Sequence, residues 1–332
     1  MNLRWLEDFL ALCETGSFTE AARRRFLTQS ALSKHMQALE TWLGAGRLFD
    51  RSTNPVEMTS VGLSFRETAS EIVMRLNAVR RGAISGGNIK SIYVSSTHSL
   101  SATFVPALSK IIQVRPSGMQ MCLHVTASNF SEALSLYERG ECDYFLCYGS
   151  RVRDIALDAE EHSRLTLGAD YLVPVSAPVK GTRKPCHVLA CASDRQLPFL
   201  GYTEDSHLGR VLQGHQAYID IADRLVPHAR SAYGETLRAG VLAGMGIAWL
   251  PYSVVRGNLE RAELSLASDD VAYFVPLTID VYRRKGIARG EVLKCWELWQ
   301  AHVANFQHLE PALPQMASGR DLLSAQIAGR SS

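Results

Sequence analysis

The first quarter of the chain has apolar residues at helical intervals, interrupted by two short polar turns. A helix is predicted over 3–15, because apolar positions recur there every three or four residues and Gly16 follows. Ser17 and Glu20 fit a capping box, which predicts a second helix from that point. A tight turn follows, in which Thr28 can cap a third helix. The expected apolar side of the second helix consists of Phe18, Ala21, Ala22 and Phe26.

The third predicted helix, over about 29–43, has two different faces. Its polar face is almost uncharged, whereas an ordinary solvated helix carries mostly Glu and Lys there. Hydroxyls, an amide and one ammonium suit a surface that exchanges hydrogen bonds with DNA bases. Two helices joined by a short turn, the second with such a face, indicate a helix-turn-helix. The apolar face consists of Leu32, Met36, Leu39 and Leu43, and the polar face of Ser30, Lys34, Gln37 and Thr41.

The pattern changes further along the chain. Residues 49–55 are typical of a loop or short wing, and a long helix with a near-heptad apolar stripe is predicted over 59–82. Such a helix either packs on a domain or pairs with its copy. After a hinge, short apolar strands alternate with helices from residue 91, which predicts an α/β domain with a parallel sheet. A closing helix is predicted over 292–309.

Length and composition are those of a globular protein with two or three domains. The 332 residues are 46% hydrophobic and 20% charged, and no apolar run is long enough to span a membrane. Acidic residues interrupt the first apolar stretch. No signal peptide is therefore expected, and the predicted location is the cytoplasm.

Net charge does not decide between function classes, because the chain carries only +2. Residues 1–60 contain seven Lys or Arg and seven Asp or Glu, so DNA binding has to be argued from the position of the charges. The consecutive Arg23, Arg24 and Arg25 cannot all face one way, since adjacent helical side chains diverge by about 100°. One of the first two is expected to meet a DNA phosphate. The others are expected to be solvated or paired with Glu20.

Seven cysteines occur without a CxxC pair or zinc-ligand spacing. They are interpreted as buried thiols, with a redox pair such as Cys142 and Cys147 as the alternative. The motifs GxGxxG, GxxxxGK(S/T), GxSxG and HExxH are absent, and His, Cys and carboxylates form no catalytic constellation. No enzymatic activity, cofactor or metal is therefore expected.

Three segments follow one another in an order that resembles the LysR-type transcriptional regulators: FLALCETGSFTEAARRRFLTQSALSKHMQALE, LFDRS and MTSVG. The resemblance covers nearly the whole chain, to about residue 308. It implies a winged helix-turn-helix, a linker helix that dimerises, and a two-lobed α/β effector domain like the periplasmic binding proteins. The implied boundaries are 1–58 for the DNA-binding domain, 59–82 for the linker helix, 83–90 for the hinge, 91–308 for the effector domain and 309–332 for a mobile tail. Lobe I is expected over about 91–163 and 269–308, and lobe II over about 164–268.

Within this family, STHSLSATFVPAL, GMGIAWLP and VYRRKGIARGEVLKCWELW are similar to the branch that contains the hypochlorite-responsive regulator. That branch is associated with methionine oxidation. Met119, Met121 and Met245 are the only methionines between the hinge and the tail, so they are the candidates for such a signal.

The resemblance implies that the start of the third helix reads DNA bases. Many relatives have Pro at the position of Ser30 and Arg at that of Lys34. Lysine cannot make the bidentate guanine contact of arginine, so Lys34 is expected to supply phosphate affinity or one guanine bond. Arg51, beside the wing, is a candidate phosphate contact together with Arg23 and Arg24. The candidate base-reading residues are Gln29, Ser30, Ser33, Lys34 and Gln37, and Thr28 is a further DNA-binding candidate.

In this family the effector lies between the lobes, where strands end and helices begin. Thr97, His98 and Ser99 follow the first strand and start a helix, whose free N–H groups suit a carboxylate or other anion. N-capping is the alternative role for Ser99 and Ser128, and a structural role is the alternative for His98. The second-rank candidates are Ser128, Gly149, Tyr202 and Thr203.

The predicted function is a sequence-specific DNA-binding transcriptional regulator. Its control is expected from a small-molecule effector, with anions among the candidates, or from an oxidant such as hypochlorite acting on the C-terminal domain. The expected partners are double-stranded DNA half-sites and further copies of the chain, as a homodimer or homotetramer, and no membrane. The alternative is a cytoplasmic small-molecule-binding protein or an enzyme on an α/β scaffold.

Overall fold

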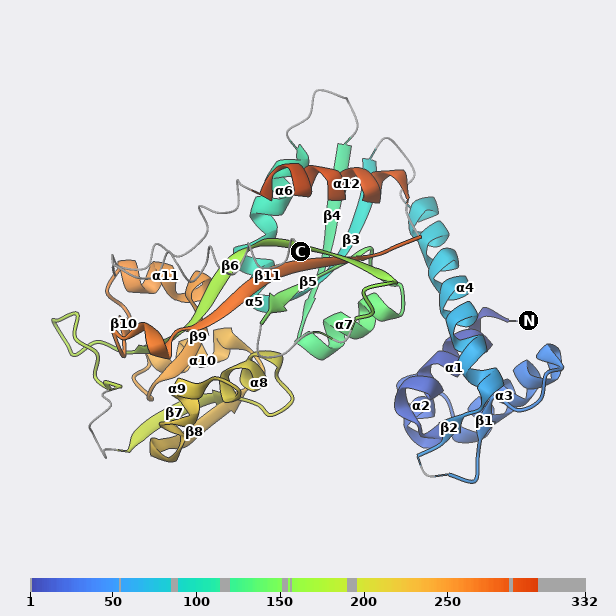
Figure 1. Ribbon diagram of the computed structural model, residues 1–332, viewed down its shortest axis with the longest axis horizontal. Helices are drawn as coiled ribbons and strands as arrows, with labels where there is room; N and C mark the ends of the chain where they lie inside the picture. The colour runs from blue at the N-terminus through green and yellow to red at the C-terminus, as the bar shows by residue number, and fades with distance from the viewer. Residues whose placement is uncertain are drawn as a thin grey trace.

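The protein consists of a small N-terminal domain, a long helix and a larger two-lobed α/β domain (Figure 1). The computed structural model describes residues 2–53, 55–84, 89–113, 120–150, 155, 157–189, 196–286 and 289–303. The predicted tail over 309–332, residues 85–88 of the predicted hinge, Met119 and Cys191 lie outside the described residues.

The N-terminal domain is a helix-turn-helix with a two-stranded wing. Ser17 and Thr28 cap their helices as predicted, because Ser17 Oγ accepts a hydrogen bond from the Glu20 amide and Thr28 Oγ1 accepts one from the Ala31 amide. The capping box at Ser17 is only half formed, since the Glu20 carboxylate binds Arg23 and the Ser17 amide donates to Thr15 Oγ1. Gly16 ends the first helix with a φ of 59°, a conformation that glycine adopts without Cβ strain. The elements are α1 (Leu3–Thr15), α2 (Phe18–Arg24), α3 (Gln29–Leu43), β1 (Phe49–Asp50) and β2 (Glu57–Met58).

The prediction that Phe26 lies on the apolar side of the second helix is wrong. Helix α2 ends at Arg24, the backbone turns to a φ of 55° at Phe26, and the Phe26 side chain is 96% exposed. Leu27 packs against the core of the domain instead. Helical spacing does not extend past the end of α2, so it cannot say which side chain of the turn points inward.

The long helix α4 (Ser60–Ile84) has an apolar stripe that is covered at one end and exposed at the other. Phe65 packs against the core of the N-terminal domain, and Ala69 is fully buried in it. Leu76 and Val79, further along the stripe, are 45% and 68% exposed. The first half of α4 therefore packs on a domain, while the second half presents apolar side chains at the surface.

The C-terminal domain alternates strands and helices along most of its length. The first lobe contains β3 (Ile89–Thr97), α5 (His98–Thr103), α6 (Val105–Gln113), β4 (Gln120–Ser128), α7 (Phe130–Glu138), β5 (Tyr144–Gly149) and α12 (Gly290–Ala301). The second lobe contains β7 (Leu197–Tyr202), α8 (His207–Gln213), α9 (Gln216–Ile219), η1 (Ala222–Arg224), β8 (Leu225–Ser231), α10 (Gly234–Leu242), β9 (Ala248–Pro251), α11 (Tyr252–Glu260), β10 (Ser265–Leu266) and η2 (Val271–Tyr273). The long strands β6 (His162–Ser176) and β11 (Val275–Arg284) run through both lobes (Figure 1).

The main sheet is mixed, and not parallel as the alternation of strands and helices predicts. Its strand order is β10-β6-β11-β5-β3-β4, with β9 also paired to β6. In this sheet β3 pairs in parallel with β4 and β5, whereas β11 is antiparallel to β5 and β6. Strand β11 enters from the second lobe against the direction of β5, so it pairs antiparallel without a helical crossover. A separate pair, β7 and β8, is parallel.

The helix predicted to start at residues 97–99 is short, and a second helix follows it at once. Helix α5 ends at Thr103, and α6 begins at Val105. Pro106 lacks the amide that a continuous helix would need for its bond to the carbonyl four residues earlier. Phe104, between the two helices, is 2% exposed, so the break also directs an aromatic ring into the core.

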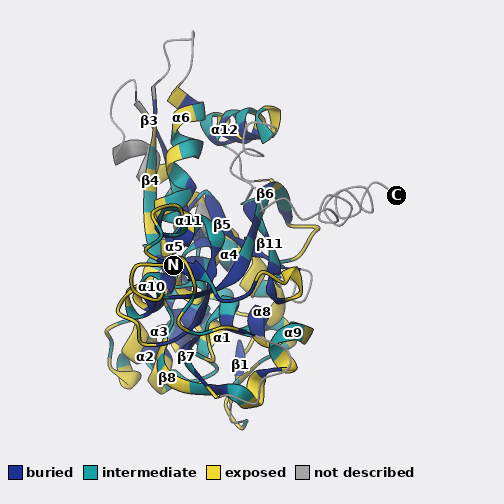
Figure 2. Ribbon diagram, turned by 90° about the vertical axis from the view of Figure 1, so that its left-hand side faces the viewer, coloured by how far each residue is buried: buried dark blue, intermediate teal, exposed yellow. Residues whose placement is uncertain are grey.

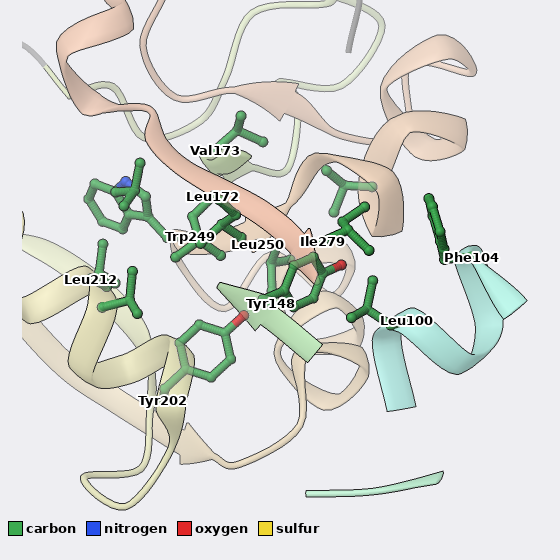
Figure 3. Close-up of a cluster of buried hydrophobic side chains, with 14 of the residues drawn as sticks. Leu100, Phe104, Tyr148, Leu172, Val173, Tyr202, Leu212, Trp249, Leu250 and Ile279 are labelled. Atoms are coloured by element: carbon green, nitrogen blue, oxygen red, sulfur yellow. The ribbon is translucent and has the colours of Figure 1, made fainter. Parts of the chain in front are cut away.

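One hydrophobic core extends through both lobes (Figure 2). Figure 3 shows part of it, where Leu172 and Val173 of β6 lie near Trp249 and Leu250 of β9 and near Ile279 of β11. The lobes therefore share apolar contacts along the long strands. Because only β6 and β11, among the described strands, pass from one lobe to the other, there is room for a cleft between the lobes beyond the ends of the other strands.

Candidate nucleic-acid interface and effector cleft

Helix α3 presents its polar face to the surface. Gln29, Ser30, Lys34, Gln37 and Thr41 are exposed along one side, while Leu32, Met36 and Leu39 are fully buried on the other. Thr28 is also exposed and caps the helix, and Ser33 is half-buried. The structure thus brings the candidate base-reading residues to one accessible surface at the start of α3.

Each arginine of the 23–25 run pairs with a carboxylate. Arg23 binds Glu20 at 2.6 Å across an exposed surface, where such a pair is weak. Arg24 binds Glu14 of α1 at 2.8 Å and also donates a hydrogen bond of 2.8 Å to Ser135 Oγ in α7. Arg24 therefore joins the N-terminal domain to the first lobe, and Arg23 is the more accessible of the two predicted phosphate contacts.

The third arginine, Arg25, belongs to a partly buried network that holds the helix-turn-helix together. Its guanidinium binds Glu7 at 2.6 Å and Asp8 at 2.7 Å, and Asp8 is 1% exposed. The second oxygen of Asp8 accepts a hydrogen bond of 2.7 Å from His35 Nδ1 on α3. Asp8 of α1 thus connects to the turn and to the recognition helix at once, and its charge is balanced by Arg25.

Arg51, at the start of the wing, is held against the helices. Its guanidinium lies 4.9 Å from the centroid of the Phe18 ring, 3.3 Å from Ser33 Oγ and 3.8 Å from a Glu40 oxygen. The side chain keeps 30% of its surface exposed. These contacts hold Arg51 beside the exposed face of α3, which is the position that a phosphate contact next to base-reading residues requires.

A cavity of about 40 Å³ lies between the lobes, where β3, β4 and β5 end and where α10 begins. Five of the seven predicted effector residues line it: Thr97, His98, Ser99, Ser128 and Tyr202. Lining residues that the sequence reasoning missed include Asn129, Phe130, Tyr148, Asp205, His207, Tyr233, Gly234 and Glu235. Most of these come from the starts of α7, α8 and α10, whose closeness to β3 depends on the fold of the two lobes.

Gly149 and Thr203 do not line this cavity. A Cβ at Gly149 would lie 2.0 Å from Asp280 Oδ2, so this glycine is needed for close packing against a buried carboxylate. Thr203 follows β7, and its hydroxyl is buried without a hydrogen-bond partner among the described residues. The N-capping role considered for Ser99 and Ser128 is also wrong, because the caps of α5 and α7 are Thr97 and Asn129.

Two aromatic contacts join the lobes across the cleft. His207 of α8 stacks on Phe130 of α7, with ring centroids 4.1 Å apart, and its Nε2 donates a hydrogen bond of 2.9 Å to the Tyr148 carbonyl. His98 of α5 contacts Tyr233 edge to face at 5.0 Å. Both contacts pair a residue of the first lobe with one of the second, so movement of the lobes must break or rearrange them.

Asp170 lies under the cleft with its carboxylate fully enclosed. It accepts hydrogen bonds from Ser253 Oγ at 2.6 Å and from the Tyr148 hydroxyl at 3.3 Å. Burial raises the pKa of Asp170 to about 6, against hydrogen bonds that lower it. Figure 3 shows Tyr202 directed toward Tyr148, and burial together with Glu235 and Asp170 raises the pKa of Tyr202. Burial also raises the pKa of Tyr148, so the Tyr148 and Tyr202 hydroxyls stay protonated.

The sulfur atoms differ in access. Cys142 and Cys147 are both buried, and burial raises the pKa of Cys147 well above its usual value, which disfavours the reactive thiolate. Cys122 and Cys186 are exposed. Met121 is 8% exposed and Met245 is 45% exposed. Among the described residues proposed for oxidation, Met245 is thus the accessible one.

These features define a class of protein. A winged helix-turn-helix with an exposed polar recognition helix is joined by a long helix to a two-lobed domain with a polar cleft. This is the architecture of a DNA-binding regulator whose second domain binds an effector. None of the described helices is long and apolar enough to cross a membrane.

The chain belongs to the LysR family of bacterial transcriptional regulators. The model of the bacterial regulatory helix-turn-helix protein of the lysR family matches residues 3–63, and that of the LysR substrate binding domain matches residues 85–301. Regulators of this family bind DNA and form oligomers, so the fold and function predicted from the sequence are confirmed at this level.

Relatives and solved structures agree with this assignment. The chain is 25% identical over 289 residues to the HTH-type transcriptional regulator YjiE of Escherichia coli K12, covering 85% of this chain and 89% of that protein. It is similar to the crystal structure of Vibrio fischeri DarR in complex with DNA, with a TM-score of 0.54, 27% identity and coverage of 90% and 98%. It shares the fold of full-length HypT from Salmonella typhimurium, a hypochlorite-specific LysR-type regulator, with a TM-score of 0.54, 24% identity and coverage of 92% and 99%.

Removal of the buried charge in the N-terminal domain should loosen that domain selectively. Asp8→Asn leaves His35 without its carboxylate and Arg25 with Glu7 alone, so we expect a loss of about 3 kcal/mol in the stability of α1–α3. Amide hydrogen exchange, resolved by segment, measures this loss. Glu7→Gln is the control, because Glu7 pairs with the same Arg25 but keeps 29% of its side chain exposed, and we expect less than about 1 kcal/mol. If the two variants lose the same stability, Asp8 does not contribute more to the domain than Glu7 does, and the prediction is wrong.

The raised pKa of Asp170 should make stability depend on pH. The folded protein binds this proton more tightly than the unfolded chain, so the stabilisation is complete below pH of about 4 and is lost as the pH rises through about 6. Over that window, wild type should lose about 3 kcal/mol of unfolding free energy relative to Asp170→Asn. Urea unfolding at a series of pH values measures the difference. The control is Asp269→Asn, at an exposed carboxyl, for which we expect no such trend. If the difference in unfolding free energy between wild type and Asp170→Asn does not change with pH, the raised pKa of Asp170 is ruled out.

Proposed function

We propose that the start of α3 reads DNA bases in the major groove through Gln29, Ser30, Ser33, Lys34 and Gln37. The observation that carries this proposal is the continuous exposed polar face of α3, capped by Thr28 and almost free of charge. Side chains of this kind match the donors and acceptors on base edges. A helix face that only contacts solvent would more commonly carry Glu and Lys.

We assign phosphate contacts to Arg51 and Arg23. Arg51 lies beside α3, and the exposed pairing of Arg23 with Glu20 costs little to exchange for a phosphate. Arg24 contacts a phosphate only if its bonds to Glu14 and Ser135 break. The exposed Leu76 and Val79 of α4 are our candidates for the contact between two copies of the chain, with each copy reading one half-site.

We further propose that the cleft between the lobes binds the effector. Thr97, His98, Ser99, Ser128 and Tyr202 converge there, from strand ends and helix starts of both lobes. A ligand in the cleft contacts both lobes, so it can shift the equilibrium between open and closed arrangements. We place this regulator in the cytoplasm, where it meets DNA, and we assign it no catalytic step.

An oxidant is the second candidate signal. The observation that favours it is Met245, which is 45% exposed, whereas Met121 is buried. Conversion of an exposed methionine to its sulfoxide replaces an apolar group by a polar one and can alter nearby packing. Hypochlorite is the oxidant in the description of HypT, whose fold this chain shares.

The recognition-helix proposal is tested by fluorescence anisotropy on DNA from upstream of the gene and on a scrambled duplex, over a salt series. Lys34→Ala should weaken binding to both duplexes and reduce the salt slope by about one unit, because the protein loses one cation that neutralises a DNA phosphate. Gln29→Ala should mainly reduce the preference for the native sequence, by a factor that corresponds to about 1–3 kcal/mol. If both variants bind like wild type, α3 does not read the DNA.

The oxidant proposal is tested by treating the protein with hypochlorite and mapping sulfoxides by mass spectrometry. Met245 should be oxidised before Met121, because the residue is more exposed. The change in DNA affinity should vanish in Met245→Leu and persist in the control Met121→Leu. An unchanged response in Met245→Leu would exclude Met245 as the sensor.

A further inference from the structure

Three buried polar atoms at the cleft have no hydrogen-bond partner among the described residues. They are Thr97 Oγ1, Tyr202 OH and Glu235 Oε2, and their residues all line the cavity. Buried polar atoms are almost always hydrogen-bonded, so three of them around one small cavity indicate a missing polar occupant. The two hydroxyls can donate or accept, whereas the Glu235 carboxylate can only accept.

Gly234 leaves the space that this occupant needs. A Cβ at Gly234 would lie 3.4 Å from Ser99 Oγ and 3.5 Å from Tyr202 OH, which is ordinary contact distance. Any larger residue would therefore fill the space between these two hydroxyls. The next residue, Glu235, projects from the first turn of the same helix, α10. The open space beside Gly234, the hydroxyls of Ser99 and Tyr202 and the Glu235 carboxylate therefore lie at the same end of the cavity.

The charge at this point is negative. Glu235 and Asp205 line the cavity, and no Lys or Arg is among the described residues that line it. The N-terminal end of a helix by itself favours an anion. At the start of α10 this end is not capped by a side chain, because the cap residue Tyr233 makes no side-chain hydrogen bond to it. Glu235, in the first turn, already places a negative charge at that end. A second negative charge beside it is repelled.

We propose that the cleft binds a small ligand that donates a hydrogen bond to Glu235, either neutral or cationic, and that it rejects carboxylates of the same size. This proposal rests on the assignment of the cleft as the effector site. It departs from the anionic effector considered from the sequence, because Glu235 and its helix enter the site only in the folded protein. The ligand donor contacts Glu235 Oε2, and its other polar groups contact the Tyr202 and Thr97 hydroxyls.

The cavity size limits the ligand. A volume of about 40 Å³ has room for roughly three water-sized groups, since one water needs about 10–15 Å³ on this measure. Acetamidinium, acetamide and acetate are therefore suitable probes. They have the same shape and the same methyl group and differ only in charge and in the number of donors.

Binding of the three probes to the full-length protein is measured by ligand-observed NMR on the methyl signal. Acetamidinium and acetamide should bind at least about tenfold more tightly than acetate, because only they donate to Glu235. Glu235→Gln should remove most of the advantage of acetamidinium. Glu260→Gln is the matched control, since it neutralises an exposed carboxylate of α11 that pairs with Arg256 outside the cleft.

Gly234→Ala provides a second, independent variant. Its methyl group occupies the space between Ser99 and Tyr202 without a severe clash, so all three probes should lose affinity while the unfolding temperature stays near that of wild type. Glu235→Gln and Gly234→Ala act by different means, on charge and on space. Agreement between them assigns the binding to the cleft.

Three results would overturn the proposal. The first is that acetate binds wild type as tightly as acetamidinium does. The second is that acetamidinium binds both variants with the affinity that it has for wild type. The third is that no probe binds at the highest soluble concentration. The last result means that only water occupies the cleft. DNA binding of the same samples is measured in parallel. Failed probe binding with intact DNA binding refutes only the ligand class, whereas absence of DNA binding by wild type refutes the proposed reading of DNA by α3.

Discussion

The antiparallel pairing of β6 with β11 is the connection on which the geometry of the cleft depends. The two strands pair from His162 opposite Arg284 to Leu172 opposite Val275, and they carry the chain through both lobes. Midway, the fully buried Asp280 carboxylate binds Arg164 at 2.6 Å and accepts a hydrogen bond of 2.7 Å from the Thr166 hydroxyl. A buried charge is tolerated only with such partners, so this network disfavours any shift of register. The two lobes are thereby joined along these two strands and share one hydrophobic core.

The same rule, that a buried charge needs partners, organises the N-terminal domain. Its basic and acidic residues are equal in number, and most of the arginines near the turn pair with carboxylates of α1 and α2. Arg25 is engaged by both Glu7 and Asp8, and Arg24 donates a hydrogen bond to Ser135 of the first lobe. The exposed face of α3 carries Lys34 as its one charge, and Arg51 lies at its border. In the DNA contact that we propose, a few placed cations supply affinity and hydrogen-bonding side chains supply specificity.

The DNA-binding end and the effector cleft are connected through a short physical path. Helix α7 contributes Ser135 to the contact with Arg24 and, at its other end, Phe130 to the stacking with His207. A change in the angle between the lobes therefore acts on the helix that contacts the DNA-binding domain. A coupling of this kind needs two arrangements of the lobes with different contacts to α7, and the two aromatic contacts across the cleft provide the elements that would change.

The sequence by itself determined the local structure, because its signals act over a few residues. Ser17, Thr28 and Gly16 set helix ends, and the apolar stripe at Leu32, Met36 and Leu39 defined the buried face of α3 and hence its polar face. Helical spacing failed at Phe26, where the chain turns, and strand–helix alternation failed to reveal that β11 returns antiparallel. Tertiary structure alone decided the cleft. Thr97 and Ser99 could be named from their position after a strand, but Glu235, Gly234 and His207 join them only because β6 and β11 bring α8 and α10 over the ends of β3 and β5. The charge of the site, and with it the class of ligand, depends on contacts between residues more than 100 positions apart, which no local pattern encodes.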